Sequence, residues 1–278
     1  MRLSGKVAVI VTCTAIAISA VLSSKKAMAE PKVQNGPITE LNNRYSSFGR
    51  GLLPFDAVIL ADGRIVVVGR GGLLSVLNAD ETQPATRVNI GAKTDLLAAA
   101  LGPDGLVRVT DGAGIIWRLN TGVDAAAREA ESAAGTLFGI QYTTDGTGIA
   151  VGEFGSVFIN APGAQEWRRV EFDWKHRLPE LVERVGDVAP HLYRVCAHPN
   201  GGALIVGEYG VVIEYQQGQW QVAQAAPDSA SLFACMISPV GLQIVAGQSG
   251  KMFTRSAASE TWNAIELPAK TDIYDLAG

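Results

Sequence analysis

One pattern recurs five times along this chain of 278 residues and constrains its fold more than any other feature. Each copy holds a hairpin turn, mostly Asp-Gly or Asn-Gly, then an apolar run rich in Val and Ile, a glycine turn and another apolar run. Such dipeptides readily adopt tight hairpin turns, and β-branched runs favour strands. The last shared glycines, separated by 42, 41, 55 and 40 residues, are Gly72, Gly114, Gly155, Gly210 and Gly250.

A further apolar run precedes the first turn of each copy, for example "LLAAALGPDG" from Leu96 and "LYRVCAHPNG" from Leu192. Each unit of about 40 residues therefore contains three or four short antiparallel strands. A unit of this kind cannot bury both faces alone, so successive units must stack. Radial stacking of four-stranded sheets predicts an all-β fold, a β-propeller with five complete units.

The propeller is predicted to occupy residues 54–278, and the final "DIYDLAG" resembles the first strand of a partial sixth unit. Residues 30–53 are a candidate segment for closing the ring. One alanine-rich stretch, "VDAAAREAESAAG" from Val123, resembles a helix and lies between two units. The number of blades and the way in which the ring closes stay open at this point.

The first 29 residues have the composition of a secretory signal peptide. Arg2 and Lys6 precede an uncharged run, and Ala27 and Ala29 occupy the small-residue positions of a cleavage site. A membrane anchor is the alternative, but the apolar run is shorter than the roughly 20 residues that span a bilayer. We therefore expect export to the periplasm or the medium, with no transmembrane segment after cleavage.

The expected mature chain is acidic and retains two of the three cysteines. It holds 19 basic against 27 acidic residues, a net charge of −8, which argues against a nucleic-acid partner. Cys196 and Cys235 lie five and six residues before the glycines of their hairpins. Because neighbouring strand positions face opposite sides of a sheet, we predict that the two thiols are buried and free.

The repeated "DG-x-x-x-x-VG-x-x-G" with a strand ending in tryptophan resembles the bacterial neuraminidase-type repeat. It is most similar to the photosystem II stability and assembly factor family and its relatives in non-photosynthetic bacteria, over about residues 54–276. The tryptophans that carry this resemblance are Trp167, Trp220 and Trp262. The resemblance implies an exported propeller without catalysis that holds a membrane protein, or a transport complex of the envelope, during assembly.

The sequence departs from the S-x-D-G-G-x-x-W signature of that family. The corresponding stretches read "NAPGAQEW", "YQQGQW" and "SAASETW", so the tryptophan is present but the Asp-Gly turn is not. This departure puts a role specific to photosynthetic members in doubt, while the architecture is unaffected.

A glycoside hydrolase of the sialidase type is the enzymatic alternative, because its propeller uses the same repeat. That chemistry needs an arginine cluster, a tyrosine activated by a glutamate and an acidic proton donor. The nearest match to its F-R-I-P element is "HRLP" at His176, far downstream of the first unit. No catalytic residue is therefore assigned, and a hydrolase should gather arginines and a Tyr–Glu pair at the funnel.

No cofactor and no metal are predicted. Glu153 and Glu208 occupy one slot after a hairpin glycine, where two carboxylates could bind a cation, but the variability of the slot favours a solvated turn. The three histidines match no zinc spacing. The "GRGG" turn from Gly69 lacks the lysine and following helix of a phosphate-binding loop.

An insertion at about residues 173–190 accounts for the one long repeat spacing. Long loops on rigid scaffolds often carry binding sites, and "PELVERV" could form a short helical turn from Pro179. A solvated loop and a partner contact are both open. The candidate partner-binding residues are Trp174, Lys175, His176 and Arg177, so deleting residues 174–189 should abolish co-purification of a partner without changing the melting temperature.

Overall fold

The computed structural model describes residues 53–276, apart from 81, 187–188, 227–228, 257–258, 260 and 269. Within this part of the chain, the strands form five separate four-stranded antiparallel sheets, each built from consecutive strands. The predicted β-propeller with four-stranded blades is confirmed. The proposed signal peptide and nearly all of the segment proposed to close the ring lie outside the described residues.

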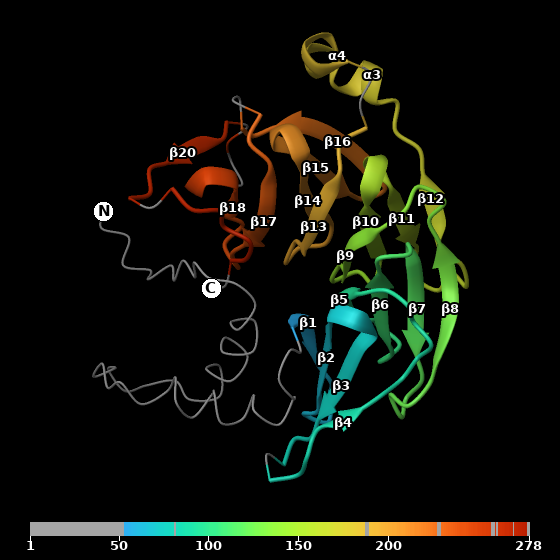
Figure 1. Cartoon of the computed structure of the whole chain (residues 1–278). Coiled ribbons are helices and arrows are strands. Elements are labelled where there is room, and N and C mark those ends of the chain that lie inside the picture. Colours follow the sequence, from blue (N-terminus) through green and yellow to red (C-terminus); the bar gives the residue numbers. More distant parts are fainter. Residues whose placement is uncertain are drawn as a thin grey trace.

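Each sheet is one blade, and its first strand is the innermost (Figure 1). Blades 1 and 2 comprise β1 (Pro54–Ile59), β2 (Ile65–Gly69), β3 (Leu73–Leu77) and β4 (Thr86–Arg87), then β5 (Leu96–Leu101), β6 (Val107–Asp111), β7 (Ile115–Leu119) and β8 (Ala126–Glu131). Blades 3 and 4 comprise β9 (Leu137–Tyr142), β10 (Gly148–Gly152), β11 (Val157–Asn160) and β12 (Arg168–Val170), then β13 (Leu192–Ala197), β14 (Ala203–Gly207), β15 (Val211–Gln216) and β16 (Gln219–Gln224). Blade 5 comprises β17 (Leu232–Ile237), β18 (Gln243–Gly247), β19 (Met252–Arg255) and β20 (Asn263–Ile265).

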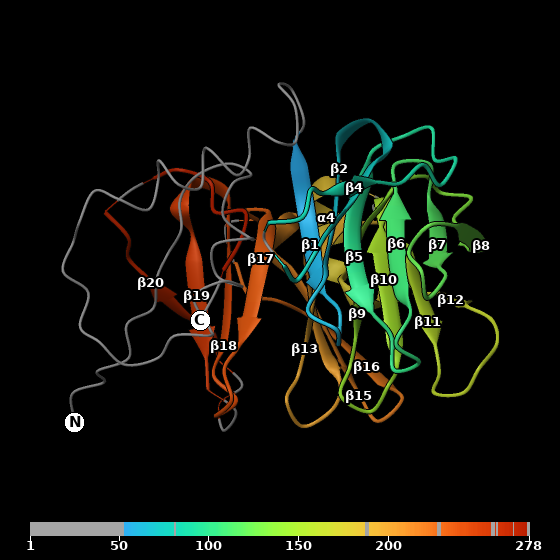
Figure 2. The same ribbon diagram turned by 90° about the horizontal axis from the view of Figure 1, so that it is seen from below.

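The inner strands β1, β5, β9, β13 and β17 follow one another around a common centre. Figure 2 shows the strands of the blades running side by side when the ring is viewed at right angles. Among the described residues, no strand pairs blade 5 with blade 1. The helices α3 (Trp174–Arg177) and α4 (Pro179–Val185) lie outside the ring beside blades 3 and 4 (Figure 1).

The hydrophobic core is divided among the interfaces between blades. One buried cluster joins blades 1 and 2, and others join blades 2 and 3, 3 and 4, and 4 and 5. A last cluster packs Ile273 and Leu276 against blade 5. In blades 2 to 5, apolar residues on both faces of the sheet are buried because each face meets a different neighbour in the described structure, as the stacking argument from the repeat requires.

The C-terminal segment Asp272–Leu276 begins a sixth unit. Its Ile273 N–H donates to the carbonyl of Gly247 at 3.0 Å. The Asp272 carboxylate accepts the N–H of Ser249 at 2.7 Å, just as Asp95 at the start of blade 2 accepts that of Gly71. The segment therefore takes the place that an inner strand occupies beside the preceding blade.

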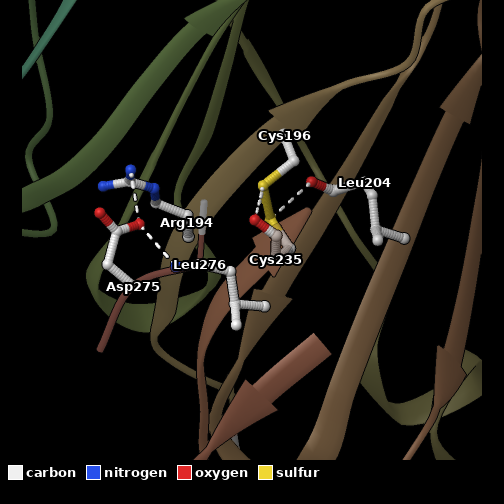
Figure 3. The surroundings of a disulfide bond; sticks show 6 residues. All are labelled: Arg194, Cys196, Leu204, Cys235, Asp275 and Leu276. Atoms are coloured by element: carbon white, nitrogen blue, oxygen red, sulfur yellow. Dashed lines mark hydrogen bonds and ion pairs between the residues drawn. A yellow bond between two sulfur atoms is a disulfide. The ribbon is translucent and has the colours of Figure 1, made fainter. Parts of the chain in front are cut away.

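Cys196 and Cys235 form a disulfide between β13 and β17, with their Cα atoms 6.0 Å apart (Figure 3). The prediction of two free thiols is wrong. Neighbouring strand positions do face opposite sides, as when Ala98 packs toward blade 3 and Ala99 toward blade 1. In a propeller, however, opposite faces of adjacent blades meet at one interface, so this alternation brings the two sulfurs together.

Two carbonyl oxygens lie close to this disulfide, those of Cys235 at 2.8 Å from the Cys196 sulfur and of Leu204 at 3.7 Å from the Cys235 sulfur. Because a disulfide sulfur carries no hydrogen, these are packing contacts. The bond thus lies within the apolar interface of blades 4 and 5, where Cys235 is buried.

The alanine-rich stretch from Val123 is not helical: it contains β8, the outer strand of blade 2. Alternate side chains of this strand have different partners. The Arg128 guanidinium lies 5.2 Å from the centre of the Trp117 ring, whereas Glu129 pairs with Arg118 on the adjacent β7 and with Arg108 on β6. These tertiary contacts outweigh the helix propensity of alanine.

Candidate functional site

Every inner strand carries a β-bulge at the same place, directly after its first residue. In β13, for example, Leu192 pairs with Gly207 and Arg194 with Val206, so that Tyr193 is the extra residue. Bulges redirect side chains and are frequent beside functional sites. The bulged residues of the five blades are Phe55, Leu97, Phe138, Tyr193 and Phe233.

A glycine at the end of the second strand permits this bulge in four of the five blades. A Cβ atom on Gly152 or Gly207 would collide with the backbone carbonyl oxygen of Thr136 or His191, just before the inner strand. The turn after the second strand and the start of the inner strand therefore lie at the same end of the blade. We call this end of the central opening the mouth.

Six aromatic rings follow one another across the mouth, and we name this set the aromatic arc. Its rings come from blade 3, blade 4, blade 5 and the C-terminal segment, although the first and last of these residues in the sequence, Phe138 and Tyr274, are 136 positions apart. The neighbouring ring centroids lie 4.9 to 6.4 Å apart, within the usual range for aromatic pairs or close to it. In spatial order the arc consists of Phe154, His191, Phe138, Tyr193, Phe233 and Tyr274.

The two ends of the arc are exposed, since Phe154 is 57% and Tyr274 is 58% accessible, and the rings between them are half-buried. Phe154 also has a left-handed backbone, with φ of 50°. This conformation costs a non-glycine residue about 1 kcal/mol. A large apolar side chain is therefore held toward solvent at a position that glycine, found at Gly71 in blade 1, would occupy with less strain.

Carboxylates lie next to the arc. Glu208 accepts the N–H of His191 at 2.9 Å and the hydroxyl of Tyr193 at 3.4 Å. Burial and the neighbouring Glu208 carboxylate raise the pKa of Tyr193 to about 12. Glu153 accepts the N–H of Thr136 at 3.1 Å in the same way. The slot that sequence analysis interpreted as a solvated turn is thus a half-buried cap for the start of the next inner strand.

The C-terminal segment adds two more carboxylates. Asp272 accepts the hydroxyl of Tyr274 at 3.1 Å, and Asp275 forms an ion pair with Arg194 at 3.2 Å (Figure 3). The ion pair of Arg194 and Asp275 thus joins β13 of blade 4 directly to the C-terminal segment that begins the sixth unit. Four carboxylates and one guanidinium therefore border the arc.

One further carboxylate lies near the axis, on β1. Asp56 accepts the N–H groups of Ala57 and Ala99, at 2.9 and 3.0 Å. Burial raises the pKa of Asp56 above its usual value, and the charge of Arg194 opposes this effect. Three charged residues directly follow the bulged position, or its equivalent, in their units: Asp56, Arg194 and Asp275. The inner strands of blades 1 and 4 and the C-terminal segment therefore carry charges that interact with one another.

The mouth contains one part of the constellation expected of a sialidase-type hydrolase, the pair of Tyr193 and Glu208. In this pair the tyrosine hydroxyl donates to the Glu208 carboxylate at 3.4 Å, which is the arrangement that activation by a base would need. Arg194 is the one arginine in the five inner strands, and it is paired with Asp275. The inner strands of the described chain therefore do not assemble the arginine cluster that binds a substrate carboxylate.

None of the four predicted partner-binding residues belongs to the arc, although Trp174 packs against Gly155, directly after Phe154 at one end of it. Trp174 is packed inward: its indole lies where a Cβ on Gly155 would be, and it stacks on Phe172 at 5.0 Å. Arg177 is exposed, but it donates to the carbonyl of Trp220 at 2.9 Å. Lys175 and His176 are exposed, and His176 pairs with Asp173.

The five predicted turn glycines occupy equivalent turns between the second and third strands. Their φ angles lie between 64° and 81°, the left-handed region that glycine tolerates best. Four of these turns are short 3-10 helices: η2 (Arg70–Gly72), η3 (Glu153–Gly155), η4 (Glu208–Gly210) and η5 (Gln248–Gly250). These glycines shape the backbone and carry no chemistry.

Two other features were considered as sites. A wide groove of about 830 Å³ lies at the outer edge of blades 3 and 4, between Arg168 and Trp220. None of the bulged residues lines it. In the described part of the chain, no three metal-ligating side chains converge. No helix there is long and apolar enough to cross a bilayer.

Sequence reasoning missed the aromatic arc, although part of its signal was present. The second residue of each run before a hairpin is Phe55, Leu97, Phe138, Tyr193 or Phe233, so an apolar or aromatic residue recurs at one repeat position. Strand alternation alone assigns such a residue to a buried interface. The bulge, which cannot be inferred from that alternation, turns it toward the mouth instead.

Comparisons with known proteins identify the architecture. No family model matches the chain, and no curated protein matches it in sequence. Among solved structures it is similar to a catalytically inactive virginiamycin B lyase from Staphylococcus aureus with quinupristin, at a TM-score of 0.65 and 10% identity, covering 80% of this chain and 72% of that one. It is also similar to YCF48 bound to D1 peptide, at a TM-score of 0.56 and 14% identity, covering 77% and 66%.

These neighbours include an enzyme and a peptide-bound protein, and their low identity to this chain shows a shared fold alone. Because its strands form five blade sheets and its structural neighbours include propellers, the chain is a β-propeller.

Proposed function

We propose that this protein is an exported, non-catalytic β-propeller that binds a protein partner and serves as an assembly or stability scaffold for an envelope or membrane complex. The carrying observation is the aromatic arc, whose exposed ends make an apolar surface on a rigid ring. Aromatic residues dominate the energy of protein interfaces, and exposed apolar groups at one place mark interaction sites.

The resemblance to the photosystem II assembly factor family supports the same role. One structural neighbour, YCF48, is seen bound to a peptide, so a propeller of this architecture can present a peptide-binding surface. Export to the periplasm or the medium rests on the composition of residues 1–29. The insertion, with Lys175 and His176 exposed, is a second candidate contact for a partner.

An affinity pull-down from envelope extract tests the proposal. The bait is the full chain, compared with a Phe154→Ser/Tyr274→Ser variant that removes the two exposed rings and with a Val240→Ser control. Val240 is 86% exposed in the β17–β18 hairpin, at the other end of the blade. We expect one defined complex with the full chain and the control, and its loss with the arc variant.

Two results would count against this function. Equal recovery of the complex by the arc variant would remove the arc as the binding surface. Turnover of a fluorogenic glycoside panel by the purified protein, abolished by Tyr193→Phe, would replace the scaffold with the sialidase-type hydrolase.

A further inference from the structure

The mouth combines aromatic faces with negative charge. Two rings of the arc, Tyr193 and Tyr274, donate their hydroxyls to Glu208 and Asp272. Glu153 directly precedes Phe154 in the same turn. The arc is therefore bordered by carboxylates from blade 3 through to the sixth unit.

Basic residues also occur at this end of the blades, among them Arg70 in the turn of blade 1 and Lys251 after the turn of blade 5. Arg194 is the guanidinium beside the arc, and its partner is Asp275. This leaves Glu153, Glu208 and Asp272 with hydrogen bonds from N–H or O–H groups but no cation in the described structure. Hydrogen bonds of this kind satisfy oxygen atoms without neutralising the charge, so these three carboxylates give the border of the arc negative charge.

We propose that the aromatic arc binds an extended cationic peptide segment in which lysine or arginine alternates with aromatic or aliphatic side chains. This proposal rests on the proposed function and specifies its partner chemistry. Apolar side chains of the segment pack against Phe154, Phe233 and Tyr274. Its cations, on the other side of the extended strand, reach the glutamate carboxylates at the border of the arc.

The dimensions agree with an extended strand. Neighbouring rings of the arc are about 5 Å apart, and side chains on one face of a strand recur about every 6.6 Å. A segment of five or six residues therefore spans the distance from Phe138 to Tyr274. The mature chain's expected net charge of −8 adds a long-range attraction for cationic segments.

Fluorescence anisotropy with labelled peptides on the full chain tests this inference. The probes are an eight-residue alternating Lys-Phe peptide, its Glu-Phe counterpart and its Lys-Ser counterpart. We expect binding of the Lys-Phe peptide alone, weakened when the salt concentration rises from 0.05 to 0.5 M, because salt screens exposed charges, as expected from a Debye length of about 4 Å at the higher value.

Variants separate the two components of the surface. Glu153→Gln/Glu208→Gln keeps the acceptors but removes two charges, and should weaken Lys-Phe binding roughly fivefold or more. Phe154→Ser/Tyr274→Ser should weaken it about tenfold or more. The control Glu171→Gln removes a charge of an exposed glutamate beside the insertion, paired with Arg169, and should leave the affinity unchanged.

Equal binding of the Lys-Phe and Glu-Phe peptides, or an equal loss of affinity with Glu171→Gln, would overturn the inference. Its failure is distinct from that of the proposed function. If envelope extract yields a complex that depends on the arc but no cationic peptide binds or competes, the scaffold role stands and the cationic partner is wrong. If neither a complex nor a peptide depends on the arc, both are wrong.

Discussion

The aromatic arc at the mouth and the helical insertion at the rim differ in how they use aromatic and charged residues. The insertion is one continuous stretch, and its Phe172 and Trp174 pack inward, leaving Lys175 and His176 in solvent. The arc gathers rings from three blades and the C-terminal segment and leaves its two end rings exposed. A loop can bury its own apolar side chains locally, whereas a ring of bulges displays them.

The largest effect is expected for the disulfide that joins β13 to β17, two strands that each carry a ring of the arc. Cys196→Ser/Cys235→Ser should lower the free energy of unfolding by about 4 kcal/mol, because the bond closes a loop across 39 positions of the chain. Urea unfolding under non-oxidising conditions measures this. The unmutated chain with reductant is the control and should match the variant; equal stability with and without the bond would contradict the prediction.

The next largest loss of stability is expected when the packing of the insertion is disturbed. Trp174→Ala should cost about 2 to 3 kcal/mol, since the indole fills the space beside Gly155 and stacks on Phe172. Deleting residues 174–189 should also destabilise the protein, because Leu178 and Leu181 are buried. The melting temperature of the deletion variant should therefore fall, in contrast to the unchanged value expected from the sequence.

Thermal unfolding checks this second prediction, with Lys175→Ala as the exposed control, which should change stability by less than about 0.5 kcal/mol. Peptide binding to the arc should be retained by the Trp174→Ala variant at temperatures where it is folded. Lost binding by a folded variant would show that rim and mouth are coupled, and would break the contrast between them.

A smaller effect on stability is expected at Phe154. Asparagine tolerates the left-handed backbone better than phenylalanine, so Phe154→Asn should leave the free energy of unfolding within about 1 kcal/mol of the original. Binding to the arc should nevertheless weaken. Ser249→Asn, at the equivalent left-handed position of blade 5, is the control for the turn and should leave binding intact. Retained binding by Phe154→Asn would remove that ring from the site.

The smallest effect is a pH dependence of stability, which should have opposite signs for Asp56 near the axis and Asp173 of the insertion. Burial raises the pKa of Asp56, so its contribution to stability is greatest when it is protonated and is lost as pH rises through the raised value. Asp56→Asn should therefore gain stability relative to the original chain between about pH 4 and neutrality. Equilibrium unfolding at several pH values measures the difference.

Asp173 of the insertion provides the matched control with the opposite sign. Hydrogen bonds from the backbone and side chain of His176 hold the pKa of Asp173 below its usual range. Its contribution is present above the unfolded-state pKa and is lost as pH falls through the lower value. Asp173→Asn should thus lose stability near neutrality, and the same sign for both variants would contradict the assigned environments.

Much of the fold could be predicted from the repeat. The positions of Gly155 and Gly210 in equivalent turns, the four-stranded blades and the helix that begins at Pro179 all follow from local turn chemistry and strand alternation. The site could not be predicted in this way. Phe138 and Tyr193 are read as ordinary interface residues until the bulge is known, because one inserted residue reverses the direction of a side chain.

The sequence by itself determined the blade, since the hairpin glycines and apolar runs encode each sheet within about 40 contiguous residues. Only the tertiary structure decided which side chains meet. The ring sets opposite faces of adjacent sheets against each other, which pairs Cys196 with Cys235, and brings Phe154 and Tyr274 to one mouth from positions 120 residues apart. Such meetings depend on how rigid sheets pack, and no local pattern encodes that geometry.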